Sequence, residues 1–295
     1  MTPINKHPIP HRVQRGCVAQ TFITLGLIGA SLLVLCLSTI AVYWLVPPPA
    51  LNIVVMGLDA REGEGMGTRS DAVMLVGLKG LNLNIASIPR DLFIQVPGYS
   101  NPQRINTINA LGELQQTGGG PRLLQDSLEA SFGIRPARYI RLDFNGFIQM
   151  IDAVGGVTVD VPYRIYDPAY PTNTYGTMTA TFEAGQQHLN GERALIYART
   201  RHQDDDYRRV ERQQQVIVAF AQKAVIPIYW PALISVIVQN VDTNLSPIDA
   251  LRALPSVMAG MFNAEQFVID RDYIVAGGIP NYAIVNPIFE AMFGN

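Results

Sequence analysis

The longest apolar stretch of the chain lies close to its N-terminus. No charged residue occurs between positions 18 and 46, and this stretch exceeds the ~20 residues that an α-helix needs to cross a bilayer core. It is also longer than the apolar core of a cleaved signal peptide. Three basic residues and no acidic residue precede it. The positive-inside rule therefore predicts a cytoplasmic tail at 1–17, one transmembrane anchor helix at 18–46 and an extracytoplasmic remainder.

Short apolar runs and helical patterns alternate in the rest of the chain. Beyond a proline spacer at 47–50, apolar runs of strand length predict strands at 51–58, 71–79, 82–88, 139–143 and 157–161. Apolar residues at helical spacing predict helices at 104–115, 122–132, 145–154, 189–198 and 206–223. This order predicts an α/β (α+β) fold in which helices sandwich a mixed central β-sheet.

Two further segments complete the predicted organisation. Tyrosine, threonine and proline are frequent in 163–178, which predicts a loop. The residues after 225 form apolar helical runs that Pro231 and Pro247 interrupt. We therefore expect a main domain at 51–225 and a mostly helical C-terminal extension at 226–295 that packs on the same domain.

The arginines stand out against an acidic body. After residue 46 there are seventeen arginines and two lysines, yet acidic residues outnumber basic ones by twenty-four to nineteen. A negatively charged domain argues against a nucleic-acid partner. Both cysteines, Cys17 and Cys36, lie at or within the apolar stretch, which excludes a disulfide or a thiolate site in the remainder. The arginines instead indicate a focused anion site, because a guanidinium fits phosphate oxygens two at a time.

Two aspartates stand at neighbouring strand ends. Asp59 follows the first predicted strand, and Asp71 opens the second, two positions after Arg69. In an extended chain Arg69 and Asp71 point the same way. Two carboxylates from adjacent strand ends can converge on one metal, and carboxylate oxygens suit Mg²⁺. The alternative is that both aspartates cap turns or pair with nearby arginines.

Further arginines follow the third predicted strand and the fourth predicted helix. Arg90 and Asp91 come just after that strand, at the kind of strand end where α/β sheets bind ligands. A surface ion pair is the alternative for these two residues. Arg199 and Arg201 are two positions apart, so in an extended segment both side chains would face one diphosphate.

The helix at 206–223 carries polar residues beside its buried face. Arg209 and Gln213 share one stripe at helical spacing, next to an apolar stripe. They therefore lie on the border of the core, where they can reach into a site. Arg208 lies nearly opposite the apolar stripe and is expected to be solvated, whereas Arg212 has an intermediate position.

The clusters occur in an order that resembles the LytR-CpsA-Psr family of cell-wall glycopolymer transferases. No G-x-S-x-G, P-loop or H-E-x-x-H motif is present, which argues against the usual hydrolase, nucleotide and zinc sites. The resemblance runs over about 51–223. It rests on NIVVMGLDAR, TRSDAVMLV, SIPRDLFIQVPG, RINTINALG, DFNGFIQMIDAVGGVTVDVP, LNGERALIYARTRH and DDDYRRVERQQ. One departure is Arg104, which replaces the usual lysine of the K-I-N motif and keeps its charge.

The resemblance implies a membrane-anchored phosphotransferase with its catalytic domain at 51–225. Such an enzyme moves a glycopolymer from a polyprenyl-diphosphate carrier to peptidoglycan through a phosphodiester, with Mg²⁺ (or Mn²⁺) at an apolar prenyl pocket. By motif position, the metal-associated residues are Asp59 and Asp71. The catalytic residues are Asp71, Arg90, Asp91, Arg199 and Arg201. The diphosphate-binding residues are Arg69, Arg90, Arg104, Arg199, Arg201, Arg209, Arg212 and Gln213.

Two other functions fit the same clusters. A hydrolase would cleave polyprenyl diphosphates with water, and a non-catalytic protein would bind lipid carriers without turnover. A regulator that acts on DNA is disfavoured by the acidic domain and by the short cytoplasmic tail. For transfer, attack on a diphosphate needs neutralised oxygens and a positioned nucleophile. Asp71 or Asp91 is the candidate base for the acceptor hydroxyl.

Overall fold

The computed structural model describes residues 14–45, 50–60, 64–172, 176–200 and 206–294. The chain divides into two compact units, residues 1–48 and residues 49–295. In the first unit, helix α1 (Gln14–Leu45) contains an 18-residue apolar window, Phe22–Thr39, with no part buried inside the protein. Length and composition make α1 consistent with a single-pass membrane anchor.

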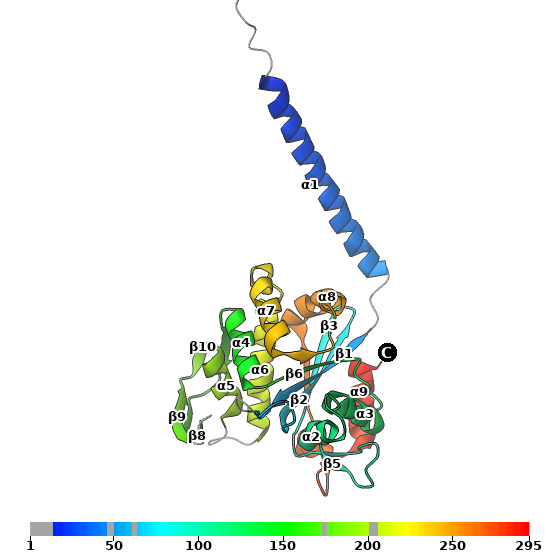
Figure 1. The fold of residues 1–295 in the computed structure, drawn as a ribbon, viewed down its shortest axis with the longest axis vertical. Helices are drawn as coiled ribbons and strands as arrows, with labels where there is room; N and C mark the ends of the chain where they lie inside the picture. The colour runs from blue at the N-terminus through cyan, green and yellow to red at the C-terminus, as the bar shows by residue number, and fades with distance from the viewer. Residues whose placement is uncertain (1–13, 46–49, 61–63, 173–175, 201–205, 295) are drawn as a thin grey trace, which may run out of the picture. The chain divides into compact units, whose positions relative to one another are not determined.

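A mixed six-stranded sheet forms the centre of the second unit (Figure 1), in the order β11-β6-β1-β2-β3-β12. Strand β1 is antiparallel to β2 and parallel to β6. The mixed central sheet predicted from the sequence is thus confirmed. The strands are β1 (Leu51–Leu58), β2 (Ser70–Lys79), β3 (Asn82–Ile88), β6 (Arg138–Leu142), β11 (Asp242–Thr243) and β12 (Glu265–Val268).

Helices cover both faces of this sheet. Alternate residues of β1 divide between them, because successive side chains of a strand point to opposite faces. Val54 and Met56 join the core formed with α2 (Ile105–Gln115), α3 (Gly120–Phe132) and α9 (Tyr282–Phe293). On the other side of the sheet, α4 (Phe144–Ala153), α6 (Asp206–Ala224) and α8 (Pro247–Asn263) contact the strands. Two further helices, α5 (Gly191–Arg199) and α7 (Trp230–Asn240), pack on α4.

The C-terminal segment supplies both edges of the sheet. Strand β11 pairs with β6 at one edge, and β12 pairs with β3 at the other. The last turn of α9 is also fixed to the sheet, because Nδ2 of Asn52 donates to the carbonyl of Phe293 at 2.7 Å and Nδ2 of Asn84 donates to that of Met292 at 2.6 Å. Residues 226–295 therefore complete the sheet as well as adding helices to it, which the sequence pattern did not predict.

Most of the described residues in the segment expected to be a loop at 163–178 instead form paired strands. Strands β8 (Ile165–Pro171) and β9 (Thr177–Phe182) pair antiparallel, and the register shifts between Asp167 and Tyr170. Pro168 lies in that shift, where its missing N–H interrupts no regular ladder. The loop prediction was wrong because tyrosine and threonine favour strands, and the proline content outweighed them in the sequence reading.

Short elements complete the second unit. Strand β7 (Val157–Val161), at the predicted position, pairs with β10 (Gly185–Leu189). Four further two-residue strands are β4 (Phe93–Ile94), β5 (Gln103–Arg104), β13 (Ile274–Val275) and β14 (Ile279–Pro280). Two single 3₁₀ turns, η1 (Pro227–Tyr229) and η2 (Arg271–Tyr273), precede α7 and β13.

One buried carboxylate ties α8 to the sheet. Asp249 forms a capping box with Ser246, and its Oδ2 accepts from Nε of Arg138 on β6 at 2.7 Å. The hydrogen bond from Arg138 is the main reason, and those from Ser246 the next, that the pKa of Asp249 is held far below its ordinary value of 3.8. Because folding lowers this pKa, the ionised Asp249 carboxylate stabilises the fold above its unfolded-state pKa of about 4. This contribution is lost as the pH falls through the folded-state value.

Asp249→Asn is therefore expected to lower the free energy of unfolding at pH 7 by about 2 kcal/mol, the worth of a hydrogen bond to a charged group. It is also expected to flatten the dependence of stability on acid. Denaturant unfolding at pH 7, 5 and 3 measures both effects. An equal loss of stability at all three pH values would contradict the assignment to the Asp249 charge.

Candidate functional site

A cavity of about 950 Å³ lies in the second unit against one face of the central sheet. Strands β1, β2 and β6 form one wall, and α4, α5 and α6 contribute the facing side chains. Its polar lining consists of Asp59, Asp71, Arg90, Asp143, Asp167, Arg199, Arg209 and Gln213. Its apolar lining includes Val55, Met74, Val76, Ile140, Leu142, Phe144, Phe147, Met150, Ile151, Leu195, Val216, Ile217 and Phe220.

The lining changes from polar to apolar along each element. On α6 the lining residues run from Arg209 and Gln213 to Phe220, a length of roughly 16 Å at 1.5 Å per residue. Along β1 they run from Asp59, just after the last residue of the strand, back to Val55. Because charged side chains gather where β1 ends and α6 begins, the cavity has one polar part and a longer apolar part. An elongated ligand with an anionic head and an apolar tail has the matching distribution.

A β-bulge directs Asp71 into the cavity. Gly57 pairs with Ala72 and Leu58 pairs with Ser70, so Asp71 is the extra residue of β2. A bulge re-aims a side chain that regular alternation would place on the other face. Asp71 thus lines the cavity next to Ala72, whereas Arg69 is exposed and is not among the lining residues. The prediction that alternation would direct Arg69 and Asp71 into one site does not hold for Arg69.

Arg90 joins the end of β3 to the start of β2. Its Nη1 donates to Oδ2 of Asp71 at 3.0 Å, and its Nε is buried without a hydrogen bond, 3.7 Å from Oδ2 of Asp91. Asp91 is half exposed and lies 3.9 Å from Nη1 of Arg104, which is itself exposed. Arg90 therefore lines the cavity, and Asp91 and Arg104 form an ion pair beside it that is not part of the lining.

Arg199 is held at the C-terminal end of α5 by aromatic and acidic neighbours. Its guanidinium lies 4.0 Å from the centre of the Phe144 ring, donates to Oη of Tyr170 at 3.1 Å and lies 3.5 Å from Oδ1 of Asp59. Burial raises the pKa of Tyr170 above its ordinary value, and the adjacent Arg199 opposes this shift. The phenol therefore stays protonated and neutral near neutral pH. It accepts the hydrogen bond from Arg199 without neutralising the charge of the guanidinium.

Close backbone packing sets the position of α5. A Cβ atom at Gly191, the first residue of α5, would overlap the backbone of Ile148 on α4. At the other end, Oγ1 of Thr200 donates to Oδ2 of the buried Asp167 on β8 at 2.8 Å. These two contacts fix both ends of the helix that presents Arg199, and they explain the glycine within the LNGERALIYARTRH motif.

The first turns of α6 divide their polar residues as helical spacing predicts, with one exception. Arg209 and Gln213 line the cavity, whereas Arg208 is exposed and pairs with Glu211 at 3.0 Å. Arg212 was expected to be intermediate but is only 4% exposed. Its Nε and Nη2 donate to the carbonyls of Tyr197 and Thr200 at 3.1 and 2.6 Å. These bonds satisfy carbonyls at the end of α5, so Arg212 fixes that end from outside the cavity lining.

The cavity thus brings together six of the residues predicted for the site. They are Asp59, Asp71, Arg90, Arg199, Arg209 and Gln213. Arg69, Asp91, Arg104 and Arg212 lie in the described part of the chain but do not line the cavity. Arg201 lies outside the described residues. Sequence reasoning missed the contributions of Asp143, Phe144 and Tyr170, although the DFNG motif contains the first two.

The cavity contains carboxylates, the oxygen ligands that Mg²⁺ prefers. Within residues 14–45, 50–60, 64–172, 176–200 and 206–294, no three His, Cys, Asp or Glu side chains are grouped to hold a metal. Mg²⁺ is commonly held by one or two carboxylates together with substrate phosphates and water. Asp59 and Asp71 line one cavity from adjacent strands. They therefore fit binding of Mg²⁺ together with a phosphate, and not a metal cage made by the protein alone.

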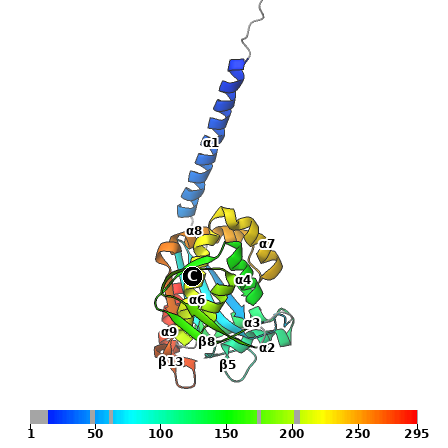
Figure 2. The same cartoon turned by 90° about the vertical axis from the view of Figure 1, so that its left-hand side faces the viewer.

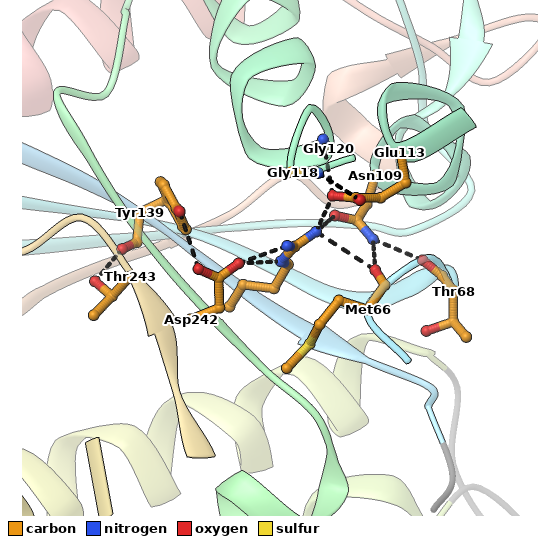
Figure 3. Close-up of polar contacts among 10 residues, drawn as sticks. Met66, Thr68, Asn109, Glu113, Gly118, Gly120, Tyr139, Asp242 and Thr243 are labelled. Atoms are coloured by element: carbon orange, nitrogen blue, oxygen red, sulfur yellow. Dashed lines mark hydrogen bonds and ion pairs between the residues drawn. The ribbon is translucent and has the colours of Figure 1, made fainter. Parts of the chain in front are cut away.

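A buried arginine network lies on the other face of the sheet and was not predicted. Arg141 of β6 lies 2.5 Å from both Glu113 and Asp242, and its Nη1 donates to Oδ1 of Asn109 at 3.0 Å. Figure 3 shows these partners together with the carbonyl of Met66 and that of Thr68, to which Nδ2 of Asn109 donates at 2.9 and 2.8 Å. The network therefore anchors the chain just before Asp71.

Comparison with known proteins places this architecture in a family. A family model described as the LytR_cpsA_psr family matches residues 47–288. The match thus extends through most of the C-terminal segment, beyond the last motif recognised in the sequence. It includes β11, β12 and α8.

Two curated relatives have similar sequences. The polyisoprenyl-teichoic acid–peptidoglycan teichoic acid transferase TagU of Oceanobacillus iheyensis is 35% identical over 221 residues, which cover 72% of this chain and 64% of TagU. The regulatory protein MsrR of Staphylococcus aureus is 31% identical over 205 residues, which cover 66% of this chain and 56% of MsrR. The chain thus spans less than two thirds of the length of these curated relatives.

Solved structures share the fold. Bacillus subtilis TagV has a TM-score of 0.64 and 26% identity, over 82% of this chain and 96% of TagV. A structure of TagT bound to LIIa-WTA has a TM-score of 0.64 and 24% identity, over 83% of this chain and 91% of TagT. The sheet, the helices around it and the family match agree with one another, and the chain belongs to the LytR_cpsA_psr family.

Proposed function

We propose that this protein transfers a glycopolymer from a polyprenyl-diphosphate carrier to peptidoglycan or another cell-envelope acceptor. The observation that carries the proposal is a cavity in which three arginines and four aspartates border a long apolar part. The name of TagU describes a transfer of teichoic acid to peptidoglycan, which supports the same reaction class here. The second unit would lie outside the cytoplasmic membrane, anchored by α1, where lipid-linked diphosphates are the available donors.

The proposed chemistry needs few covalent contributions from the protein. An acceptor hydroxyl oxygen attacks the phosphorus that carries the glycopolymer, a phosphodiester forms, and the bond to the bridging oxygen breaks to release polyprenyl monophosphate. Arg90, Arg199 and Arg209 would neutralise the phosphate oxygens, which is the main catalytic demand of phosphoryl transfer. Mg²⁺ or Mn²⁺, held between Asp59, Asp71 and the diphosphate, would supply further positive charge when bound.

Asp71 is the proposed acceptor of the hydroxyl proton. It lines the cavity, whereas the other candidate, Asp91, is half exposed and pairs with Arg104. Arg90, at 3.0 Å, would orient the Asp71 carboxylate toward the acceptor. The apolar side chains of β1, β2, α4 and α6 would hold the prenyl chain, because each buried methylene contributes about 0.8 kcal/mol to binding.

The proposal is tested with the full-length protein, a lipid-linked glycopolymer donor and purified peptidoglycan. We expect polymer-linked peptidoglycan and polyprenyl monophosphate to form in equal amounts, and we expect removal of divalent metal with a chelator to suppress both products. Release of prenyl monophosphate at the same rate without acceptor, with no linked product, would replace transfer by hydrolysis. Tight donor binding without either product under any metal would indicate a non-catalytic carrier-binding protein.

A further inference from the structure

Large apolar side chains are exposed on two consecutive helices of the second unit. On η1 and α7, Ile228, Ile234 and Val238 are 77%, 61% and 78% exposed. On α8 the exposed residues are Ile248, Leu251 and Met258. Single exposed apolar residues are ordinary, but a contiguous group marks an interaction surface. Figures 1 and 2 both show α7 and α8 at the same end of the second unit, and these six residues are called the α7–α8 face below.

The same helices bury a different set of side chains. Leu233 of α7 belongs to the core with Phe147 and Tyr229, and Ala253 and Val257 of α8 pack on the sheet. Both helices are thus apolar on their inner and outer sides. A helix that faces water on its outer side normally carries polar residues there, so the core of this unit does not account for the α7–α8 face.

The charge pattern around the face suits lipid. No charged residue occurs from 224 to 241. The acidic residue within α8, Asp249, is buried and paired with Arg138, whereas Arg252 is exposed. Tyr229 and Trp230 stand where the chain enters α7, and tyrosine and tryptophan favour the membrane–water interface. An apolar surface with an aromatic border and a cation is the composition of an element that lies in the interface of an anionic bilayer.

The position of β1 supplies an independent reason. Leu51, the first residue of β1, packs in the same apolar cluster as Ala253 and Val257 of α8. It follows Leu45, the last residue of α1, by six positions, and six residues span at most roughly 21 Å. We therefore propose that the α7–α8 face lies in the interfacial region of the bilayer that holds α1. This inference does not depend on the transfer reaction.

The position of α7 would also give the prenyl chain of the proposed donor a route from the bilayer, a step that rests on the proposed function. Tyr229 and Leu233 belong to the same apolar cluster as Phe147, Met150 and Phe220, which line the apolar part of the cavity. An interfacial α7 would thus stand between the bilayer and that part of the cavity. A prenyl chain could then pass from lipid into protein over a short apolar distance.

The test measures where single side chains lie in a lipid bilayer. In the full-length protein with Cys17→Ser and Cys36→Ser, one cysteine is introduced as Val238→Cys or Leu251→Cys, labelled with a nitroxide and reconstituted in vesicles of phosphatidylethanolamine and phosphatidylglycerol. The matched control is Leu114→Cys on α2, where the native side chain is 84% exposed. Collisions with oxygen, which concentrates in lipid, are compared with collisions with a water-soluble nickel chelate.

We expect labels at 238 and 251 to lose their broadening by the nickel chelate and to keep that by oxygen, while the label at 114 keeps the nickel effect. Equal nickel accessibility at all three positions would overturn the proposal. Dipolar broadening between labels at 238 would also overturn it, because a second copy would then cover the face. Donor turnover by the same labelled proteins is measured separately, so failure of docking and failure of transfer remain distinguishable.

Discussion

Arg90→Ala is expected to lower the rate of the chemical step of glycopolymer transfer by about 10²–10³-fold, the usual loss when one preorganised donor to a transition-state oxyanion is removed. Arg90 is the arginine that connects β3 to the proposed base, since its Nη1 lies 3.0 Å from Oδ2 of Asp71. Its loss would remove one positive charge from the phosphate site and would remove the hydrogen bond that orients the Asp71 carboxylate. Single-turnover assays with saturating donor measure the chemical step directly.

Two further variants make this result specific. Arg90→Lys keeps the charge but loses the planar fork, so we expect an intermediate rate if two phosphate oxygens are held at once. Arg122→Ala removes an arginine of α3 that is 80% exposed and does not line the cavity, and its rate should equal that of the native protein. Native activity in Arg90→Ala, or equal losses in Arg90→Ala and Arg122→Ala, would refute the assignment of Arg90 to the site.

The sequence predicted the central strands well because each is long enough to show its pattern. Strands β1 and β3 have the predicted bounds, and β2 begins one residue earlier than expected. The edge strands β11 and β12 contain two and four residues, which is too short for periodicity to appear. Their places in the sheet depend on contacts with β6 and β3 that no local pattern encodes.

The positions of the candidate site residues followed from the sequence where local geometry decides the direction of a side chain. Helical spacing separated Arg209 from Arg208 correctly, because a helix has one regular period. It did not predict the buried position of Arg212, since that side chain is drawn to the carbonyl groups at the end of another helix. Alternation failed at Arg69 because the bulge at Asp71 breaks the period. In both cases a tertiary contact or a register shift overrode the local rule.

Arg141→Met is expected to lower the free energy of unfolding at pH 7 by about 3–5 kcal/mol, the cost of removing one partner from a buried ion pair. Arg141 is 4% exposed, and its loss would leave the carboxylates of Glu113 and Asp242 facing each other without a cation. Burial raises the pKa of Glu113, but the hydrogen bond from Arg141 and those from two backbone amides outweigh it, so the pKa lies below its ordinary value of 4.5.

This pKa fixes the direction of the pH dependence. Glu113 stabilises the native fold above its unfolded-state pKa, and the contribution disappears as the pH falls through the lower folded-state value. The difference in unfolding free energy between the native protein and Arg141→Met should therefore shrink below about pH 4.5. A protonated Glu113 is neutral, so its burial without the arginine costs less. Denaturant unfolding from pH 7 to pH 3 measures that difference.

The chain contains a matched control for this network. Arg135 also contacts two carboxylates, those of Asp126 and Glu129, but it is 47% exposed. Solvent screens such surface pairs, so Arg135→Met should cost only about 0–1 kcal/mol. Adding Glu113→Gln and Asp242→Asn to Arg141→Met should recover part of the loss, because the uncompensated charges are then gone. Equal effects of Arg141→Met and Arg135→Met would show that burial does not set the worth of the network.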